Sequence, residues 1–243
     1  MKEKSKEDSL QYQPNHFDGF SYLITRPADI EKLDPRAKIL LEPGQVAFLE
    51  DYPDPLTAMI KKAARLEAVP NLAKWLASLW NVPVTLEIHT SSELYDMDAV
   101  WLRFKVREET EDQPAWQPAF NLLGFSNIRE IRVPDLLREV FAVTGEINHN
   151  GYGVAGRLHH PDLVGNEATF YETYNEGKAF YHLPDMAIEW EFSGGYYETE
   201  EARQAFGLYE FEDGLPQFLN LYFGELLRKR ELKIDADGSV KKD

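Results

Sequence analysis

The spacing of apolar residues changes twice along the chain, from a helical period to a strand period and back again. After Asp54-Pro55 and after Pro70, large apolar residues recur every three or four positions, which predicts two helices. Asp54 is the expected N-cap of the first helix, which should end near Val69. A short helix around 136–141 follows the same pattern, and Gly145 can terminate it.

The clearest helical period lies near the C-terminus and predicts an amphipathic helix from Gly214 to Arg228. Its apolar stripe consists of Leu215, Phe218, Leu219, Tyr222, Phe223, Leu226 and Leu227. Burying this stripe against a sheet should contribute on the order of 10 kcal/mol before conformational entropy is subtracted. We therefore expect this helix to close the fold.

Strict alternation of apolar and polar residues predicts two half-buried strands, 84–89 and 100–107. The outward positions of the first strand are acidic and those of the second are basic, so pairing across the strands accounts for both charges without a ligand. His89 on that face is expected to be a sheet residue exposed to solvent rather than a metal ligand.

Three further segments carry strand or turn signals. Residues 168–183 resemble a hairpin with its turn at 175–177, and Met186 to Phe192 predicts another strand. Asn148 to Gly151 is expected to be a turn. In the N-terminal segment from His16 to Pro43, repeated prolines indicate short extended pieces.

These elements predict an α+β fold: a mainly antiparallel sheet with helices packed on one face and a closing C-terminal helix. The polar segment from Glu108 to Pro118 is the best place to divide the chain. The division gives an N-terminal α+β part over residues 16–110 and a second α+β part over 111–232, with one continuous domain as the alternative. The first dozen residues and Asp235 to Asp243 are expected to be frayed ends.

The composition narrows the class of protein. The 243 residues include no cysteine, which excludes disulfide scaffolds and thiol chemistry, and they carry a formal net charge of −16. That charge disfavours nucleic acid and anionic membranes as ligands and favours a basic protein partner, unless it serves only solubility. The sequence shows no signal peptide and no apolar run of membrane-spanning length, so we expect a cytoplasmic protein.

One set of residues could assemble a hydrolase or transferase site from distant parts of the chain: His159, His160, His182, Glu189 and Glu191. Adjacent histidines tend to point apart on a strand, and the histidine spacing of zinc hydrolases is absent. Gly151 to Gly156 superficially fits a nucleotide-binding motif but follows a helix and a turn rather than a strand. The expectation is therefore no catalytic residue, no metal ligand and no cofactor, with the dispersed site as the alternative function.

The segment from Met186 to Asp213 combines acidic and tyrosine side chains, with eight acids and one base. Acidic residues steer a basic partner towards the protein, and tyrosines provide contact area at low entropic cost. The predicted partner-binding residues are Glu189, Glu191, Tyr196, Tyr197, Glu198, Glu200, Glu201, Tyr209, Glu210, Glu212 and Asp213. The alternative is a sheet edge whose charges prevent aggregation.

The residues from Val133 onward resemble a known family. Pro134 to Val140, the glycine- and asparagine-containing segment 145–151, and Asp213 to Leu219 are together similar to the SMI1/KNR4 (SUKH) superfamily. The resemblance implies a bacterial immunity protein that neutralises a toxin by binding it, without catalysis or cofactor. A nuclease-type toxin with a basic substrate groove would be such a partner.

Overall fold

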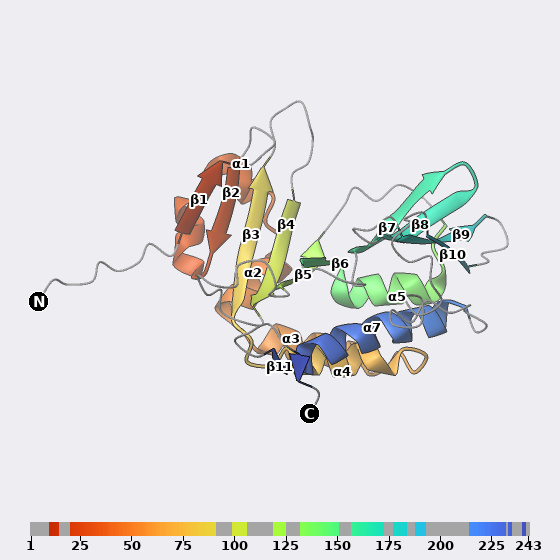
Figure 1. The fold of residues 1–243 in the computed structure, drawn as a ribbon. Helices are drawn as coiled ribbons and strands as arrows, with labels where there is room; N and C mark the ends of the chain where they lie inside the picture. Colours follow the sequence, from red (N-terminus) through yellow and green to blue (C-terminus); the bar gives the residue numbers. More distant parts are fainter. Residues whose placement is uncertain are drawn as a thin grey trace, which may run out of the picture.

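The computed structural model describes residues 10–14, 20–90, 99–105, 119–124, 132–150, 157–172, 177–183, 188–192, 214–231, 233–234 and 240–241. Within them the chain forms an α+β fold with one ten-stranded sheet, in which each strand from β1 to β10 lies beside its neighbours in sequence. Helices cover one face of this sheet (Figure 1). The predicted fold class, including the C-terminal helix, is confirmed.

The bounds of the elements follow a simple order along the chain. The large sheet contains β1 (Leu10–Pro14), β2 (Phe20–Ile24), β3 (Val84–Thr90), β4 (Ala99–Lys105), β5 (Ala119–Gly124), β6 (Glu146–Asn150), β7 (Arg157–Val164), β8 (Glu167–Glu172), β9 (Gly177–His182) and β10 (Ile188–Phe192). The helices are η1 (Pro27–Lys32), α1 (Pro35–Ile39), α2 (Pro43–Glu50), α3 (Asp54–Ala63), α4 (Pro70–Ser78), α5 (Asp135–Thr144) and α7 (Leu215–Glu231). A small second sheet pairs β11 (Lys233–Ile234) with β12 (Val240–Lys241).

Short helices, rather than extended pieces, occupy most of the segment that follows β2. Pro27, Pro35 and Pro43 each begin one of them, because the first helical turn does not use the missing N–H and the fixed φ of proline suits a helix. The Asp34 side chain caps α1 by accepting a hydrogen bond from the Ala37 N–H at 2.9 Å. The prediction of extended structure at these prolines was wrong.

The helices predicted from apolar spacing are present. Helix α3 starts at Asp54 itself, with Pro53 in the N-cap position, and ends at Ala63 rather than near Val69. Helix α4 begins at Pro70 as predicted. Helix α5 stops at Gly145, whose φ of 61° favours glycine.

Most predicted strands are confirmed, and two predictions in the C-terminal half are corrected. The hairpin of β8 and β9 and the strand β10 lie where the sequence placed them. Residues 148–150, predicted as a turn, belong to β6, because β5 offers them backbone partners that are distant in sequence. The predicted fraying from 235 onward is wrong at β12, which pairs with β11.

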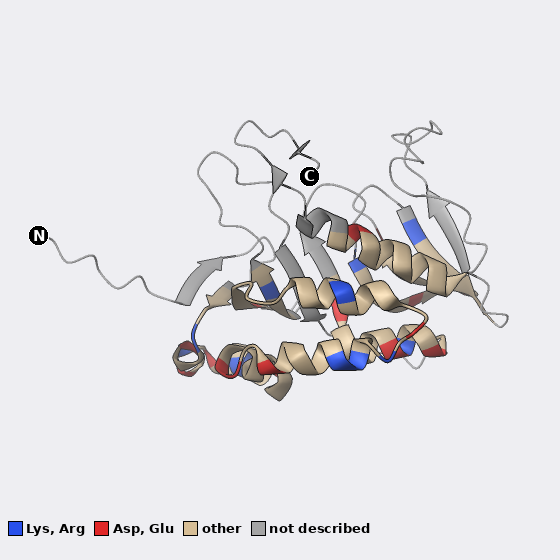
Figure 2. Cartoon of the chain, turned by 90° about the horizontal axis from the view of Figure 1, so that it is seen from below, with Lys and Arg blue, Asp and Glu red and all other residues tan. Residues whose placement is uncertain are grey.

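One hydrophobic cluster extends from Tyr22 to Leu226 and includes residues of both halves of the chain. Helix α7 packs along α4 beneath the sheet, and Figure 2 shows this helical layer from below. The ring centroids of Phe223 in α7 and Trp75 in α4 are 5.5 Å apart, and both side chains are fully buried. The segment 108–118, the expected division point, lies outside the described residues.

Two asparagines fix α4 against α7. The Asn71 side chain donates to the backbone oxygen of Asn220 at 3.0 Å, and the Asn71 N–H donates to the Asn220 side chain at 3.3 Å. Asn220 in turn donates to the Ala68 carbonyl at 2.6 Å. Such a paired polar contact in an apolar interface specifies one alignment of the two helices. No helix in the described ranges is both long and apolar enough to cross a membrane.

Candidate functional site

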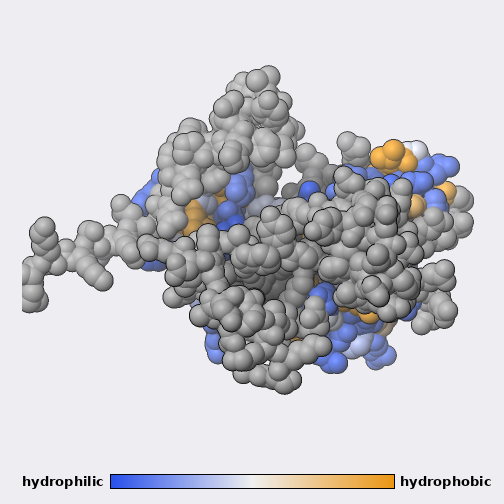
Figure 3. Space-filling model, viewed as in Figure 1, coloured by the Kyte–Doolittle hydropathy of each residue, from blue (hydrophilic) through white to orange (hydrophobic). Residues whose placement is uncertain are grey.

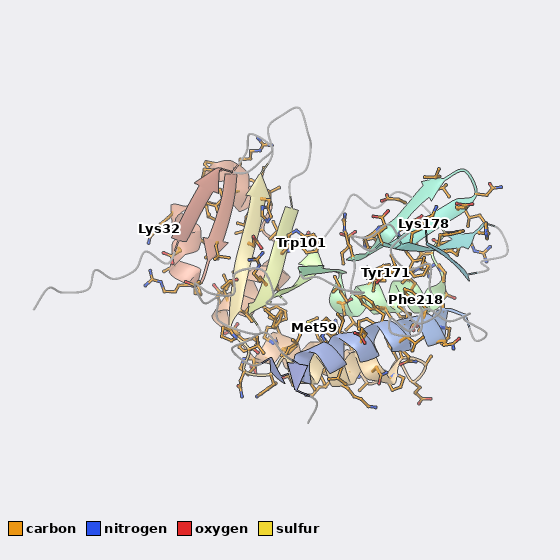
Figure 4. All side chains as sticks on the ribbon, viewed as in Figure 1. Lys32, Met59, Trp101, Tyr171, Lys178 and Phe218 are labelled. Carbon is orange, nitrogen blue, oxygen red and sulfur yellow. The ribbon has the colours of Figure 1, made fainter. Side chains whose placement is uncertain are left out.

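The strands β7, β8 and β9 present two different faces. One face packs on α7, where the ring centroids of Tyr171 and Phe218 are 5.2 Å apart; Figure 4 shows both residues between these strands and the helix. The register places Glu172 opposite both Arg157 and Lys178. Directly opposed residues of an antiparallel pair share a face, so these charged residues lie together on the outer face, away from α7.

A β-bulge interrupts β7 at His159-His160-Pro161. The register shift between Leu158 and Asp162 leaves these three residues opposite a single residue of β8, Phe170. Pro161 has no N–H to donate to the ladder, which explains why regular pairing fails here. The bulge changes the direction of the side chains, so His159 and His160 contact different parts of the structure.

Glu146 is a buried carboxylate at the junction of β6 and β7. Its side chain is 1% exposed and accepts a hydrogen bond from the Arg157 guanidinium at 2.9 Å and another from the His160 backbone N–H at 3.0 Å. A buried charge is tolerated only when it is paired in this way. Glu146 therefore has a structural role, and its charge neutralises that of Arg157.

His159 is buried on the outer face beside two carboxylates. Its side chain is 2% exposed, and Nδ1 lies 2.8 Å from the backbone oxygen of His160. Nε2 has no hydrogen-bond partner among the described residues and lies 3.8 Å from the Glu172 carboxylate, while the Asp162 carboxylate is 3.9 Å from Nδ1. We call His159, Asp162 and Glu172 the His159 cluster.

His160 and His182 lie elsewhere. The His160 ring packs on Phe141 of α5 with centroids 4.6 Å apart, and burial lowers the pKa of its imidazole, partly opposed by the Glu146 charge. The His182 ring packs on Phe180 within β9, with centroids 5.3 Å apart. The cluster of titratable groups in β7 and β8 thus contains one histidine.

The residues of the alternative hydrolase site are distributed over three strands. His159 and His160 are in β7, His182 is in β9, and positions 189 and 191 are in β10, opposite Phe180 and Lys178. The two adjacent histidines have separate contacts, as expected for neighbours on a strand. Within the described part of the chain, no group of three or more histidine or acidic side chains is placed to hold a metal ion.

Only two of the predicted partner-binding positions fall within the described residues. Glu189 and Glu191 belong to β10, the final strand of the large sheet in the described ranges. The others, from Tyr196 to Asp213, lie outside these ranges. The position of β10 is compatible with either interpretation of the acids, a partner-binding surface or a charged sheet edge.

A related cluster lies on the outer face of β3 and β4. The Glu87 carboxylate forms an ion pair with the Arg103 guanidinium at 2.8 Å and lies 3.3 Å from Nε2 of His89. The predicted pairing of acidic and basic strand faces is confirmed here. Trp101, on the same face, is buried although the alternation predicted an outward position.

The sequence analysis did not identify the buried charge of Glu146 or its partner Arg157. Their contact depends on the register of β6 against β7, which local patterns do not specify. The available signal was Pro161, because a proline within a strand pattern indicates an edge or a bulge.

The chain matched no protein-family model, no curated protein and no solved structure.

Proposed function

We propose that this chain is a non-catalytic protein that binds a basic partner, as a cytoplasmic bacterial immunity protein of the SMI1/KNR4 (SUKH) type would bind a toxin. The partner class is a nuclease-type toxin domain, whose positively charged substrate groove complements an acidic surface. Binding alone would neutralise such a toxin by covering that groove.

The observation that supports this proposal is the uneven distribution of charge. Residues 146–213 contain fourteen acidic and three basic residues, a net charge of −11, whereas residues 22–89 contain nine and eight, a net charge of −1. A charge present only for solubility needs no such concentration. This part of the sequence therefore has the excess negative charge that steers a cationic protein.

Described side chains show that part of this charge is accessible. Asp162 and Glu172 are 74% and 58% exposed on the outer face of β7 and β8. Val164, the last residue of β7, is also exposed. Among the coloured residues of Figure 3, hydrophilic surface surrounds a few small hydrophobic patches. Exposed acids around limited apolar contact area are typical of the rim of a protein interface.

The test is co-expression with a candidate nuclease-type toxin domain, followed by binding kinetics at two ionic strengths. Reversing Glu198, Glu200 and Glu201 together to lysine should slow association and flatten its dependence on salt, because peripheral charges act mainly on the association rate. Replacing Tyr196 or Tyr197 by alanine should instead accelerate dissociation if the tyrosine anchors the interface. Unchanged kinetics and full protection in the triple lysine variant would place the interface elsewhere.

A further inference from the structure

We propose that the His159 cluster binds one ammonium or guanidinium group of the basic partner. This inference rests on the proposed function and assigns a specific anchor to it. The anchor combines a neutral imidazole acceptor, Nε2 of His159, with the carboxylate of Glu172 and the nearby carboxylate of Asp162.

The first step is the tautomer of His159. Its Nδ1 lies 2.8 Å from the backbone oxygen of His160, and a carbonyl oxygen can only accept a hydrogen bond. Nδ1 therefore carries a proton, and in the neutral form of the ring Nε2 is an acceptor. That acceptor is buried and has no partner, a condition that a ligand donor would relieve.

The second step is the charge around the ring. Arg157 lies opposite Glu172 in the register, but its guanidinium is paired with the buried Glu146. Lys178 lies opposite Glu172 in the register, but its ammonium group is 3.8 Å from Glu167 and 5.0 Å from the centroid of the Phe180 ring. Within the described ranges, Glu172 and Asp162 have no lysine or arginine partner, so the cluster has an uncompensated negative charge.

The third step is the separation of the acceptors. Nε2 of His159 and Oε2 of Glu172 are 3.8 Å apart. A lysine ammonium group has three donors and makes hydrogen bonds of about 2.8–3.0 Å, so one nitrogen can bridge two acceptors at this separation. Nε2 is covered in the free protein, so the exposed Glu172 side chain beside it turns aside as the cation enters between the two acceptors.

The probe is a capped tetra-arginine peptide, titrated into the full chain at pH 7.5 and low ionic strength. ¹⁵N NMR of the histidine side chains should first show His159 protonated at Nδ1 and unprotonated at Nε2. The peptide should then shift the Nε2 resonance of His159 while Nδ1 remains protonated. His182, whose ring packs on Phe180 in the same sheet, provides the internal reference.

Two matched variants test the site by affinity. Glu172→Gln and Glu139→Gln remove the same charge from exposed side chains, but only Glu172 contacts His159. Glu172→Gln should weaken peptide binding about tenfold, as expected for a charge-assisted hydrogen bond, and Glu139→Gln by less than about twofold. His159→Asn, which retains a donor near the Nδ1 position and removes Nε2, should weaken binding similarly.

The proposal is overturned if Nε2 of His159 is protonated in the free protein, if the peptide does not bind, or if both glutamine variants bind the peptide equally. Equal binding would leave general attraction by the acidic region intact, and the toxin experiment would still decide the proposed function. Because Glu172 is exposed, its variant gives an answer even if His159→Asn fails to fold.

Discussion

The outer faces of β3–β4 and β7–β8 contain the same kind of charged cluster in two different states. In each, a largely buried glutamate is paired with an arginine, Glu87 with Arg103 at 2.8 Å and Glu146 with Arg157 at 2.9 Å. A histidine lies in both clusters. In the first cluster the histidine lies beside the glutamate that is paired with arginine. In the second, the histidine lies beside two further carboxylates that have no lysine or arginine partner in the described ranges.

The histidine contacts show this difference directly. Nε2 of His89 lies 3.3 Å from the same glutamate that forms an ion pair with Arg103. We call the β3–β4 cluster closed because its charged groups are paired with one another. Nε2 of His159 has no hydrogen-bond partner, and the adjacent Glu172 has no basic partner in the described ranges. A closed cluster stabilises a sheet, while a cluster with surplus negative charge is suited to a cationic ligand. The comparison therefore assigns stability to one face and recognition to the other.

The largest expected effect is the loss of the buried carboxylate in the second cluster. Glu146→Ala should lower the free energy of unfolding by about 3–5 kcal/mol, because the Arg157 guanidinium and the His160 N–H lose their partner in a buried site. Urea denaturation measures the change. Glu87→Ala is the matched variant on β3 and should cost less, because its side chain is 13% rather than 1% exposed. The reverse order would contradict the assignment of Glu146 as the more important structural charge.

A smaller effect on stability is expected at the contact between helices α4 and α7. Asn220→Ala should cost about 0.5–1.5 kcal/mol, since the Asn71 N–H and the Ala68 carbonyl lose their side-chain partner between α4 and α7. Leu221→Ala, at the neighbouring exposed position of α7, should change stability by less than about 0.5 kcal/mol. Equal melting curves for the two variants would show that the asparagine contact does not hold the helices together.

A third prediction concerns the contribution of His160, one of the two histidines in the bulge, to the pH dependence of stability. Burial lowers the pKa of His160 in the folded state, so the unfolded chain binds the proton more readily. The resulting contribution to stability is present above the ordinary histidine pKa of about 6.5 and is lost as the pH falls through that value. Replacing His160 by phenylalanine should flatten the stability curve between about pH 7 and pH 5. An unchanged slope, measured by urea denaturation at each pH, would remove His160 as its source.

The sequence predicted the elements whose signal is local. The apolar stripe of α7 and the alternation of β3 and β4 each lie within one segment, so period alone identifies them. It also predicted the charge pairing between β3 and β4, because these neighbouring strands have complementary outward residues.

What the sequence did not predict depends on partners far along the chain. Strand β6 was taken for a turn because its asparagines favour turns locally, whereas pairing with β5 decides its conformation. The His159 cluster requires the bulge in β7 and the register of β8, which together bring Glu172 to the histidine. Composition indicated an acidic region but not which acids have partners.

The smallest expected effect is on the stability of the surplus acids. Glu172→Gln should change the free energy of unfolding by no more than about 0.5 kcal/mol, because the carboxylate is exposed and lies 3.8 Å from Nε2 of His159, beyond hydrogen-bond distance. The same holds for Asp162→Asn, since that carboxylate is also exposed. Urea denaturation at low and physiological salt provides the measurement. A loss of 2 kcal/mol or more, on the order of that for a buried hydrogen-bonded charge, would show that the second cluster is as closed as the first. The charged clusters on the outer faces of β3–β4 and β7–β8 would then both serve to stabilise the sheet.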